Sequence, residues 1–179
     1  MTDIREQFNQ RAADWDKTHD YSTDHIRTML MLCNIRPDCV MLDVGCGTGF
    51  LLPYLMRYKP RRILAVDFAE NMIAEAQSKL QDKRVEFRCD NIFYVSPQDI
   101  RCDYAFFYSV FQYFDEPRRI IRHIRTLMNP AARIVICQHQ AGLSADAIVK
   151  MLAPYFRLDV IIDNNVMFMV SGCMLNLEE

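Results

Sequence analysis

From Val40 onward, short apolar runs alternate with stretches whose apolar residues repeat at helical spacing, and this alternation restricts the fold most. The apolar runs predict five strands, over residues 40–44, 62–67, 85–89, 104–108 and 133–138. The stretches between them predict helices over residues 51–58, 70–80 and 116–128. Successive strands joined by helices form a mostly parallel sheet, because each connection must cross over the sheet. The pattern therefore predicts a doubly wound α/β fold.

The last part of the chain departs from this alternation. A short helix expected over 145–152 is followed by apolar runs over 156–162 and 166–173, with Asp-Asn-Asn between the two runs. Two apolar runs on either side of such a turn predict an antiparallel hairpin. The complete expectation is a seven-stranded, mostly parallel sheet that ends in a C-terminal antiparallel hairpin.

Two helices are expected before the sheet. Phe8, Ala12 and Trp15 are spaced by four and three residues, so they form one apolar stripe of a helix over 4–18. A second helix starts near Ser22 or Thr23, either of which could cap it with its hydroxyl, and it ends before Pro37. A chain of 179 residues is expected to fold as a single domain, over 1–179.

The composition excludes several classes of protein. Twenty-one basic and 23 acidic residues give a net charge of -2, which argues against nucleic acid or anionic lipid as the main partner. We expect no membrane span, because no apolar run approaches roughly 20 residues, and the charged N-terminus is untypical of a signal peptide. The seven cysteines form no CxxC pair. They are interpreted as buried thiols in the reducing cytoplasm, and no metal site is expected.

A glycine-rich loop, Asp-Val-Gly-Cys-Gly-Thr-Gly over 43–49, follows the first expected strand. Gly45 and Gly47 would let the backbone turn tightly and approach a ligand, and the helix start that follows favours an anionic group. The dinucleotide pattern requires a third glycine at position 50, where this chain has Phe50. Asp43 would repel a pyrophosphate, but it suits a ligand that carries an ammonium or sulfonium charge.

Two further acids end neighbouring strands. Asp67 ends the second strand, 20 residues after Gly47, and Asp90 follows the third. The carboxyl ends of parallel strands share one edge, where such folds bind ligands. A carboxylate at position 67 can accept from both ribose hydroxyls, and one at position 90 can accept from an exocyclic amino group such as that of adenine. Each acid alone could equally be a cap or turn residue, but Asp43, Asp67 and Asp90 beside a glycine loop favour a nucleoside site.

These motifs resemble the class I S-adenosylmethionine-dependent methyltransferases. The matching segments are VMLDVGCGTG (40–49), VDFAENM (66–72), CDN (89–91) and CDYAF (102–106), and the resemblance spans about residues 38–175. The opening FNQRAADWD (8–16) is similar to the lead-in of small-molecule enzymes related to the ubiquinone and menaquinone C-methyltransferases, which more often have Tyr where Trp15 stands. The resemblance implies a Rossmann-like methyltransferase that uses S-adenosyl-L-methionine and transfers its methyl group to a small molecule.

The resemblance also implies roles for individual residues. The cofactor would contact Asp43, Gly45, Cys46, Gly47, Asp67, Phe68, Met72, Asp90, Asn91, Ile92 and Tyr108. Of these, the glycines would line the methionine part, the three acids would serve the ammonium, the ribose and the adenine, and Tyr108 would lie near the sulfonium. Residues 1–36 would form a helical lid, in which Phe8, Trp15 and Tyr21 supply aromatic walls.

The chain departs from the family where a general base is expected. Gln112 stands where many small-molecule relatives carry His, and no Asn-Pro-Pro-Tyr segment follows the fourth strand, which argues against methylation of adenine or glutamine amino groups. Tyr108, Gln112 and His139 are the candidates for catalysis, although Tyr108 also fits as a packing aromatic and His139 as a loop residue. Methyl transfer from a sulfonium needs little acid–base help when the acceptor is reactive, so the chemistry requires none of them.

Two alternatives stay open. A nicotinamide-dependent oxidoreductase would need the missing third glycine, and it would tolerate Asp43 poorly. A non-catalytic module or partner subunit that binds S-adenosylmethionine would account for the missing histidine. The acceptor atom, whether carbon, oxygen, nitrogen or sulfur, is also open. The short segment 139–153 favours a compact acceptor or one bound partly by a second subunit, as in a homodimer.

Overall fold

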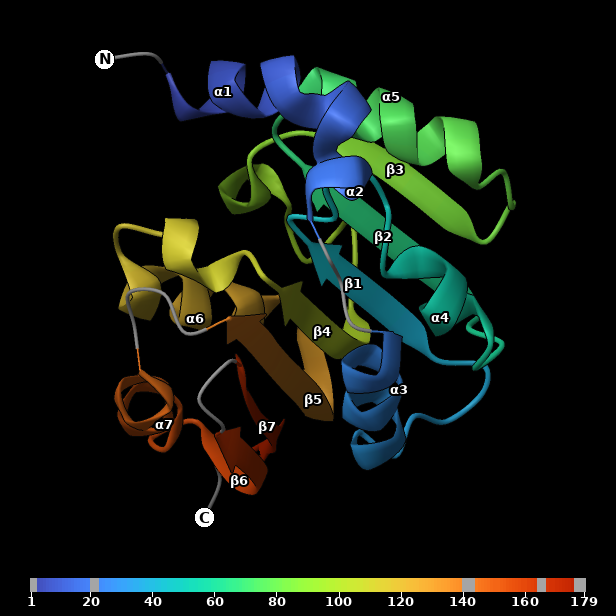
Figure 1. The fold of residues 1–179 in the computed structure, drawn as a ribbon. Helices are drawn as coiled ribbons and strands as arrows, with labels where there is room; N and C mark the ends of the chain where they lie inside the picture. The colour runs from blue at the N-terminus through green and yellow to red at the C-terminus, as the bar shows by residue number, and fades with distance from the viewer. Residues whose placement is uncertain (1–2, 20–22, 140–143, 164–166, 176–179) are drawn as a thin grey trace.

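A computed structural model describes residues 3–19, 23–139, 144–163 and 167–175 of the chain (Figure 1). Its centre is a seven-stranded sheet with the order β3-β2-β1-β4-β5-β7-β6. In that order, the strands span Val85–Cys89, Arg62–Asp67, Val40–Val44, Cys102–Tyr108, Met128–His139, Met167–Met174 and Phe156–Asp163. Strands β1 to β5 are parallel, and β7 is antiparallel to both β5 and β6. The expected fold class, with its C-terminal hairpin, is therefore confirmed.

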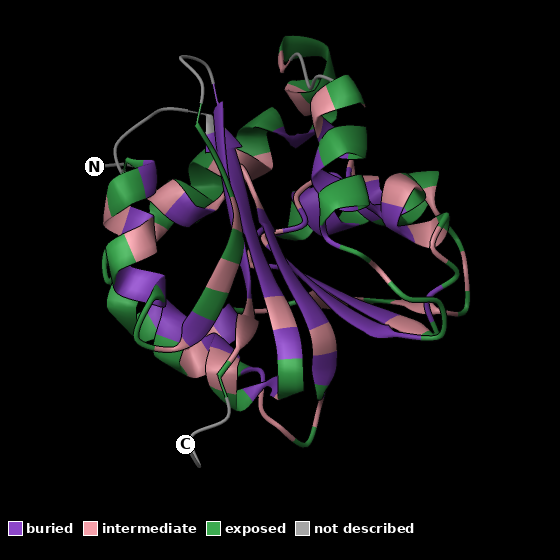
Figure 2. Cartoon of the chain, turned by 90° about the horizontal axis from the view of Figure 1, so that it is seen from below, coloured by how far each residue is buried: buried purple, intermediate pink, exposed green. Residues whose placement is uncertain are grey.

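Helices lie on both faces of this sheet, which Figure 2 shows nearly edge-on. Within the described residues the helices are α1 (Ile4–Arg11), α2 (Trp15–Thr18), α3 (Thr23–Leu32), α4 (Leu52–Met56), α5 (Glu70–Lys79), α6 (Pro117–Thr126) and α7 (Ala145–Leu152). Side chains of α6 and α7 pack with one face of the sheet, and side chains of α3 and α4 pack with the other. None of these helices has the length and apolar character that crossing a bilayer requires.

Alternation along each strand divides the apolar residues between the two faces. On β4, Phe107 belongs to the core under α6 and α7, whereas Phe106 belongs to the core under α3 and α4. Both rings are at most 1% exposed. The strands at the centre of the sheet are thus buried on both sides, which explains why their sequences are nearly continuous apolar runs.

The boundary between α6 and β5 corrects two expectations. The helix expected over 116–128 ends at Thr126, and the strand expected over 133–138 begins already at Met128. The reason is a tertiary contact, because Met128 pairs with Cys102 at the start of β4. The helix expected over 51–58 is also shorter, since α4 covers only Leu52–Met56.

The N-terminal segment lies across α5 at the edge where β1, β2 and β3 end (Figure 1). Two side chains of α1 hold it there. Arg5 forms an ion pair with Glu70, and Asn9 accepts two hydrogen bonds from Asn71, at 3.0 Å on its side-chain oxygen and 3.1 Å on its backbone carbonyl. Helix α3 differs, because it buries Ile26 in the core instead. The described residues of 1–36 therefore divide into a segment at the edge of the sheet and a core helix.

Candidate functional site

Two connected cavities open at the carboxyl edge of the parallel strands. The inner cavity, of about 70 Å³, lies over the glycine loop, and the outer cavity, of about 600 Å³, lies beside it. Both are lined by Gly45, Asp67, Phe68, Val110 and Tyr113. Together they form a single depression at the place where folds of this kind bind ligands.

The glycine loop turns sharply after β1. The amides of Gly45 and Cys46 both donate to the carbonyl of Val66, at 2.8 and 3.0 Å, so the loop folds back onto the end of β2. Gly45 has a φ of +66°, and a Cβ there would lie 2.3 Å from Cγ2 of Val110. Gly47 has a φ of +52°, but a Cβ there would meet nothing within 4 Å. Gly45 is therefore required by packing and conformation, whereas Gly47 is required by conformation alone.

Asp67 is held rigidly at the end of β2. One carboxylate oxygen accepts from the amide of Gly47 and the other from the amide of Ala69, each at 2.9 Å. Burial raises the pKa of Asp67, and these amides oppose the rise. Each carboxylate oxygen can accept more than one hydrogen bond. Asp67 therefore presents fixed acceptors to both cavities.

Asp43 is the most unusual group of the inner cavity. It is 1% exposed, and its Oδ2 has no hydrogen-bond partner among the described residues. Burial, and then the nearby charge of Asp67, raise the pKa of Asp43 to about 7. A buried carboxylate without a partner is costly to the fold. Such groups are found at functional sites, where a ligand supplies the missing partner.

Asp90, Asn91 and Ile92, three of the residues expected to contact the cofactor, follow β3 and border the outer cavity. Asp90 already has local partners, because it accepts from Arg88 at 3.0 Å and from the amide of Asn91 at 2.8 Å. The side chain of Asn91 caps the next turn by accepting from the amide of Phe93. Both carboxylate oxygens of Asp90 thus have partners, and one of these partners, Arg88, was not expected at the site.

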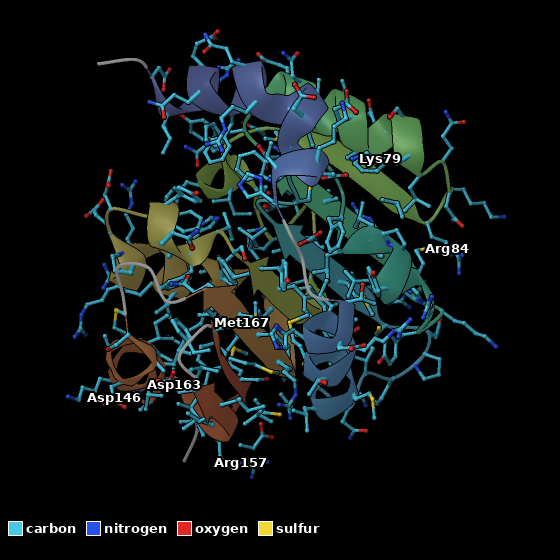
Figure 3. The ribbon with its side chains drawn as sticks, viewed as in Figure 1. Lys79, Arg84, Asp146, Arg157, Asp163 and Met167 are labelled. Carbon is cyan, nitrogen blue, oxygen red and sulfur yellow. The ribbon has the colours of Figure 1, made fainter. Side chains whose placement is uncertain are left out.

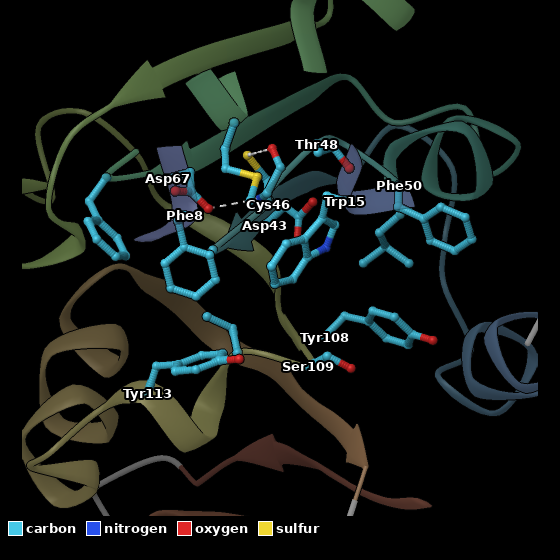
Figure 4. Close-up of a pocket in the computed structure, with 16 residues that line it drawn as sticks. Phe8, Trp15, Asp43, Cys46, Thr48, Phe50, Asp67, Tyr108, Ser109 and Tyr113 are labelled. Carbon is cyan, nitrogen blue, oxygen red and sulfur yellow. Dashed lines mark hydrogen bonds between the residues drawn. The ribbon is translucent and has the colours of Figure 1, made fainter. Parts of the chain in front are cut away.

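Aromatic rings from the N-terminal segment close the inner cavity (Figure 4). The ring centre of Phe8 lies 5.4 Å from that of Trp15, 5.8 Å from that of Phe68 and 5.2 Å from that of Tyr113. Cys46, Met72 and Tyr108 line the same cavity. The third expected wall residue, Tyr21, lies outside the described residues.

The candidates for catalysis are separated by the structure. Tyr108 lines the inner cavity. Gln112 borders neither cavity. It lies in the turn Phe111–Tyr113, and its Nε2 donates to the carbonyl of Ser109. His139 ends β5, and its side chain is not among those described. In the described part of the chain, no cluster of His, Cys, Asp and Glu could hold a metal ion.

Sequence reasoning missed six residues that line the inner cavity: Thr48, Phe50, Leu51, Ser109, Val110 and Tyr113. Thr48 and Phe50 belong to the glycine loop and its continuation, so their neighbourhood was visible in the motif. Ser109 adopts a φ of +54°, which is uncommon for a side chain larger than glycine and has no sequence signature.

The fold and this edge define an α/β domain of the class I methyltransferase type. The chain belongs to the family described as "Methyltransferase domain", whose model matches residues 42–136. The expectations of fold and family are therefore confirmed. The matched part includes the glycine loop and all three acids at the strand ends.

Individual relatives agree with this assignment. Malonyl-[acyl-carrier protein] O-methyltransferase of Bacillus cereus is 28% identical over 126 residues, which are 68% of this chain and 46% of that protein. The chain thus spans about half the length of the curated relatives it matches. Among solved structures, the methyltransferase in complex with the Trm112 activator of Haloferax volcanii has a TM-score of 0.86 at 13% identity, covering 99% of this chain and 100% of that one. The N-methyltransferase NodS of Bradyrhizobium japonicum, in complex with S-adenosyl-L-homocysteine, has a TM-score of 0.82 at 14% identity, with 97% and 100% covered.

Proposed function

We propose that this domain binds S-adenosyl-L-methionine and transfers its methyl group to a small molecule. The observation that carries the proposal is the pair of acids at the glycine loop. Asp67 is fixed by two backbone amides and offers acceptors for the two ribose hydroxyls, while the buried Oδ2 of Asp43 lacks a partner that an ammonium group would supply. A nucleoside that carries positive charge satisfies both groups at once.

A nicotinamide dinucleotide fits these residues less well. Its pyrophosphate would have to lie against the glycine loop, within reach of Asp43 and Asp67, which are both buried acids. Phe50 occupies the position of the third glycine and packs against Tyr54, with ring centres 5.9 Å apart. We therefore favour the methyltransferase over the oxidoreductase.

The residues of the chain would act mainly by placement. S-Adenosyl-L-methionine supplies an electrophilic methyl group on a positively charged sulfur. Asp67 would hold the ribose, Asp43 would balance positive charge, and the rings of Phe8 and Trp15 would exclude water from the inner cavity. Alignment of the reacting atoms and removal of water supply much of the rate enhancement in such transfers. The reaction then needs no base at Gln112 or His139.

The acceptor proposed here is a small, uncharged molecule. The Bacillus cereus relative named above is a malonyl-[acyl-carrier protein] O-methyltransferase. Among the described residues that line the inner cavity of this chain, none carries a cationic side chain that could pair with a carboxylate, whereas six are aromatic: Phe8, Trp15, Phe50, Phe68, Tyr108 and Tyr113. This lining favours an apolar or planar acceptor.

Our proposal also includes the cellular setting. All seven cysteines are free, and five of them are buried: Cys33, Cys39, Cys46, Cys102 and Cys137. This thiol pattern supports a reducing compartment, the cytoplasm. A homodimer is proposed as one way to complete the acceptor site, and nucleic acid is not proposed as a partner.

Ligand binding and turnover test the proposed function. Purified protein titrated in a calorimeter is expected to bind S-adenosylhomocysteine and to show no response to NADH. Incubation with S-adenosylmethionine labelled in the methyl group and fractionated metabolites is expected to give a labelled product. Tight NADH binding without S-adenosylhomocysteine binding would overturn the proposal. Binding without transfer to any fraction would favour the non-catalytic module.

The pKa of Asp43 predicts how binding depends on pH. Below about 7, Asp43 is mostly protonated and attracts an ammonium group weakly; above about 7, it is a carboxylate. The affinity for S-adenosylhomocysteine, which keeps the ammonium group, is therefore expected to rise between pH 6 and pH 8. Calorimetry at both pH values measures this change. Asp43→Asn is expected to remove most of it, and an equal pH dependence in this variant would contradict the assignment.

A further inference from the structure

We propose that Asp16 is a positioning residue that fastens the Trp15 wall to the glycine loop and thereby slows release of the cofactor. The inference rests on the proposed function, because it concerns the ligand assigned to the inner cavity. Asp16 is the last residue of the FNQRAADWD segment (8–16). It is not one of the residues expected to contact the cofactor.

The carboxylate of Asp16 joins three separate parts of the chain. Its Oδ1 accepts from the hydroxyl of Thr48 at 2.5 Å, and its Oδ2 accepts from the ammonium group of Lys79 at 2.5 Å. Lys79 also donates to the carbonyl of Thr48 at 3.2 Å. Lys79 lies at the end of α5, on the side that faces α2 (Figure 3). Asp16 therefore ties α2 both to the glycine loop and to α5.

The Asp16 and Lys79 side chains are 35% and 40% exposed, so the bond to Thr48 is what distinguishes this arrangement from an ordinary surface ion pair. Exposed ion pairs contribute little, because water competes for both charges. Here Thr48 is only 2% exposed, and its hydroxyl donates to a carboxylate, which makes a stronger bond than one between neutral groups. Both oxygens of Asp16 are engaged, and Lys79, the donor to one of them, also donates to the backbone carbonyl of Thr48. The three groups thus form one network at the rim of the inner cavity.

The network bears on ligand exchange because Trp15 is the neighbour of Asp16. The inner cavity measures about 70 Å³ with Trp15 in its wall, whereas ligand pockets usually have several hundred Å³. The inner cavity would have to widen to hold a ligand, and Trp15 forms part of its wall. Moving α2 away from the loop, and Trp15 with it, breaks the bond between Asp16 and Thr48.

The rest of the segment has its own attachment. Asn9 on α1 bonds to Asn71 through two hydrogen bonds, and Phe8 packs against Phe68. Loss of the Asp16 carboxylate should therefore free α2 and Trp15 without detaching α1. Asp16 then controls the mobility of the wall, not the folding of the N-terminal segment.

Trp15 is the only tryptophan of the chain, so its fluorescence reports directly on the wall. In stopped-flow experiments, S-adenosylhomocysteine is expected to leave Asp16→Asn about tenfold to a hundredfold faster than it leaves the wild type, as loss of a bond to a charged group implies. Thr48→Val should accelerate release similarly, and the double variant should add little. Raising the salt concentration should speed release from the wild type more than from Asp16→Asn.

Asp14→Asn is the matched control, because Asp14 lies on the other side of Trp15 and pairs only with the exposed Lys17, at 2.8 Å, among the ion pairs of the described residues. Its release rate should equal that of the wild type. Circular dichroism should show that every variant is folded, and Asp16→Glu, which keeps the carboxylate, should restore part of the slow release. Normal binding with release rates within twofold of the wild type in Asp16→Asn, or an equal acceleration in Asp14→Asn, would overturn the inference alone. Failure of the wild type to bind S-adenosylhomocysteine would overturn the proposed function and this inference with it.

Discussion

Replacing Asp67 with alanine is expected to weaken the binding of S-adenosylhomocysteine by about 1–3 kcal/mol, or roughly fivefold to 150-fold in Kd. Two effects act in the same direction. The variant loses the charge-assisted acceptors proposed for the ribose hydroxyls. It also loses the bonds by which Asp67 fixes the amides of Gly47 and Ala69, so the glycine loop is less ordered before binding. Isothermal titration calorimetry measures the change.

Two controls separate these effects from a general loss of structure. Asp67→Asn keeps the shape and one carbonyl oxygen, so it should retain more affinity than Asp67→Ala. Asp24→Ala removes an acid that is 90% exposed at the start of α3, and it should bind as the wild type does. An unchanged Kd in Asp67→Ala would show that this carboxylate does not contact the nucleoside.

Replacing Gly45 with alanine is expected to lower the free energy of unfolding by about 2–5 kcal/mol and to abolish cofactor binding. The new Cβ would lie 2.3 Å from Cγ2 of Val110 and would also force a φ of +66° on alanine. Val110 cannot yield easily, because a β-branched side chain has few rotamers. Denaturant unfolding measures the loss, and calorimetry measures the binding.

The neighbouring glycine provides the control for Gly45. Gly47→Ala carries a similar conformational strain, but its Cβ would meet nothing within 4 Å, so it should cost only about 1–2 kcal/mol of stability. Adding Val110→Ala to Gly45→Ala should restore part of the stability, since it removes the clashing methyl groups. Equal losses in the Gly45 and Gly47 variants would mean that Val110 does not restrict this loop.

The sheet and the acidic edge could be predicted because their signals are local. The bounds of β1, β2 and β3 match the expected strands, since β1 and β2 are mostly apolar runs and β3 alternates apolar with charged residues. The common edge of Asp43, Asp67 and Asp90 then follows from parallel topology alone. The α6–β5 boundary could not be predicted in this way, because the pairing of Met128 with Cys102 joins residues that are distant in the sequence.

The candidate site was less predictable wherever its residues depend on tertiary contacts. The apolar stripe of Phe8 and Trp15 indicates that this face is buried, but it does not say against what. Val110 covers Gly45 only because of the turn after β4, and Arg88 pairs with Asp90 only because of the geometry after β3. The network of Asp16 with Thr48 and Lys79 joins three segments, and no spacing within one segment signals it.

A crystal structure with S-adenosylhomocysteine bound would be the most direct test of the proposed site. We expect both ribose hydroxyls within hydrogen-bond distance of the Asp67 carboxylate, and the ammonium group on the side of Asp43, with Trp15 covering the methionine part. A crystal soaked at saturating concentration with no nucleoside at the glycine loop, or with the nucleoside turned so that its ribose faces away from Asp67, would contradict it.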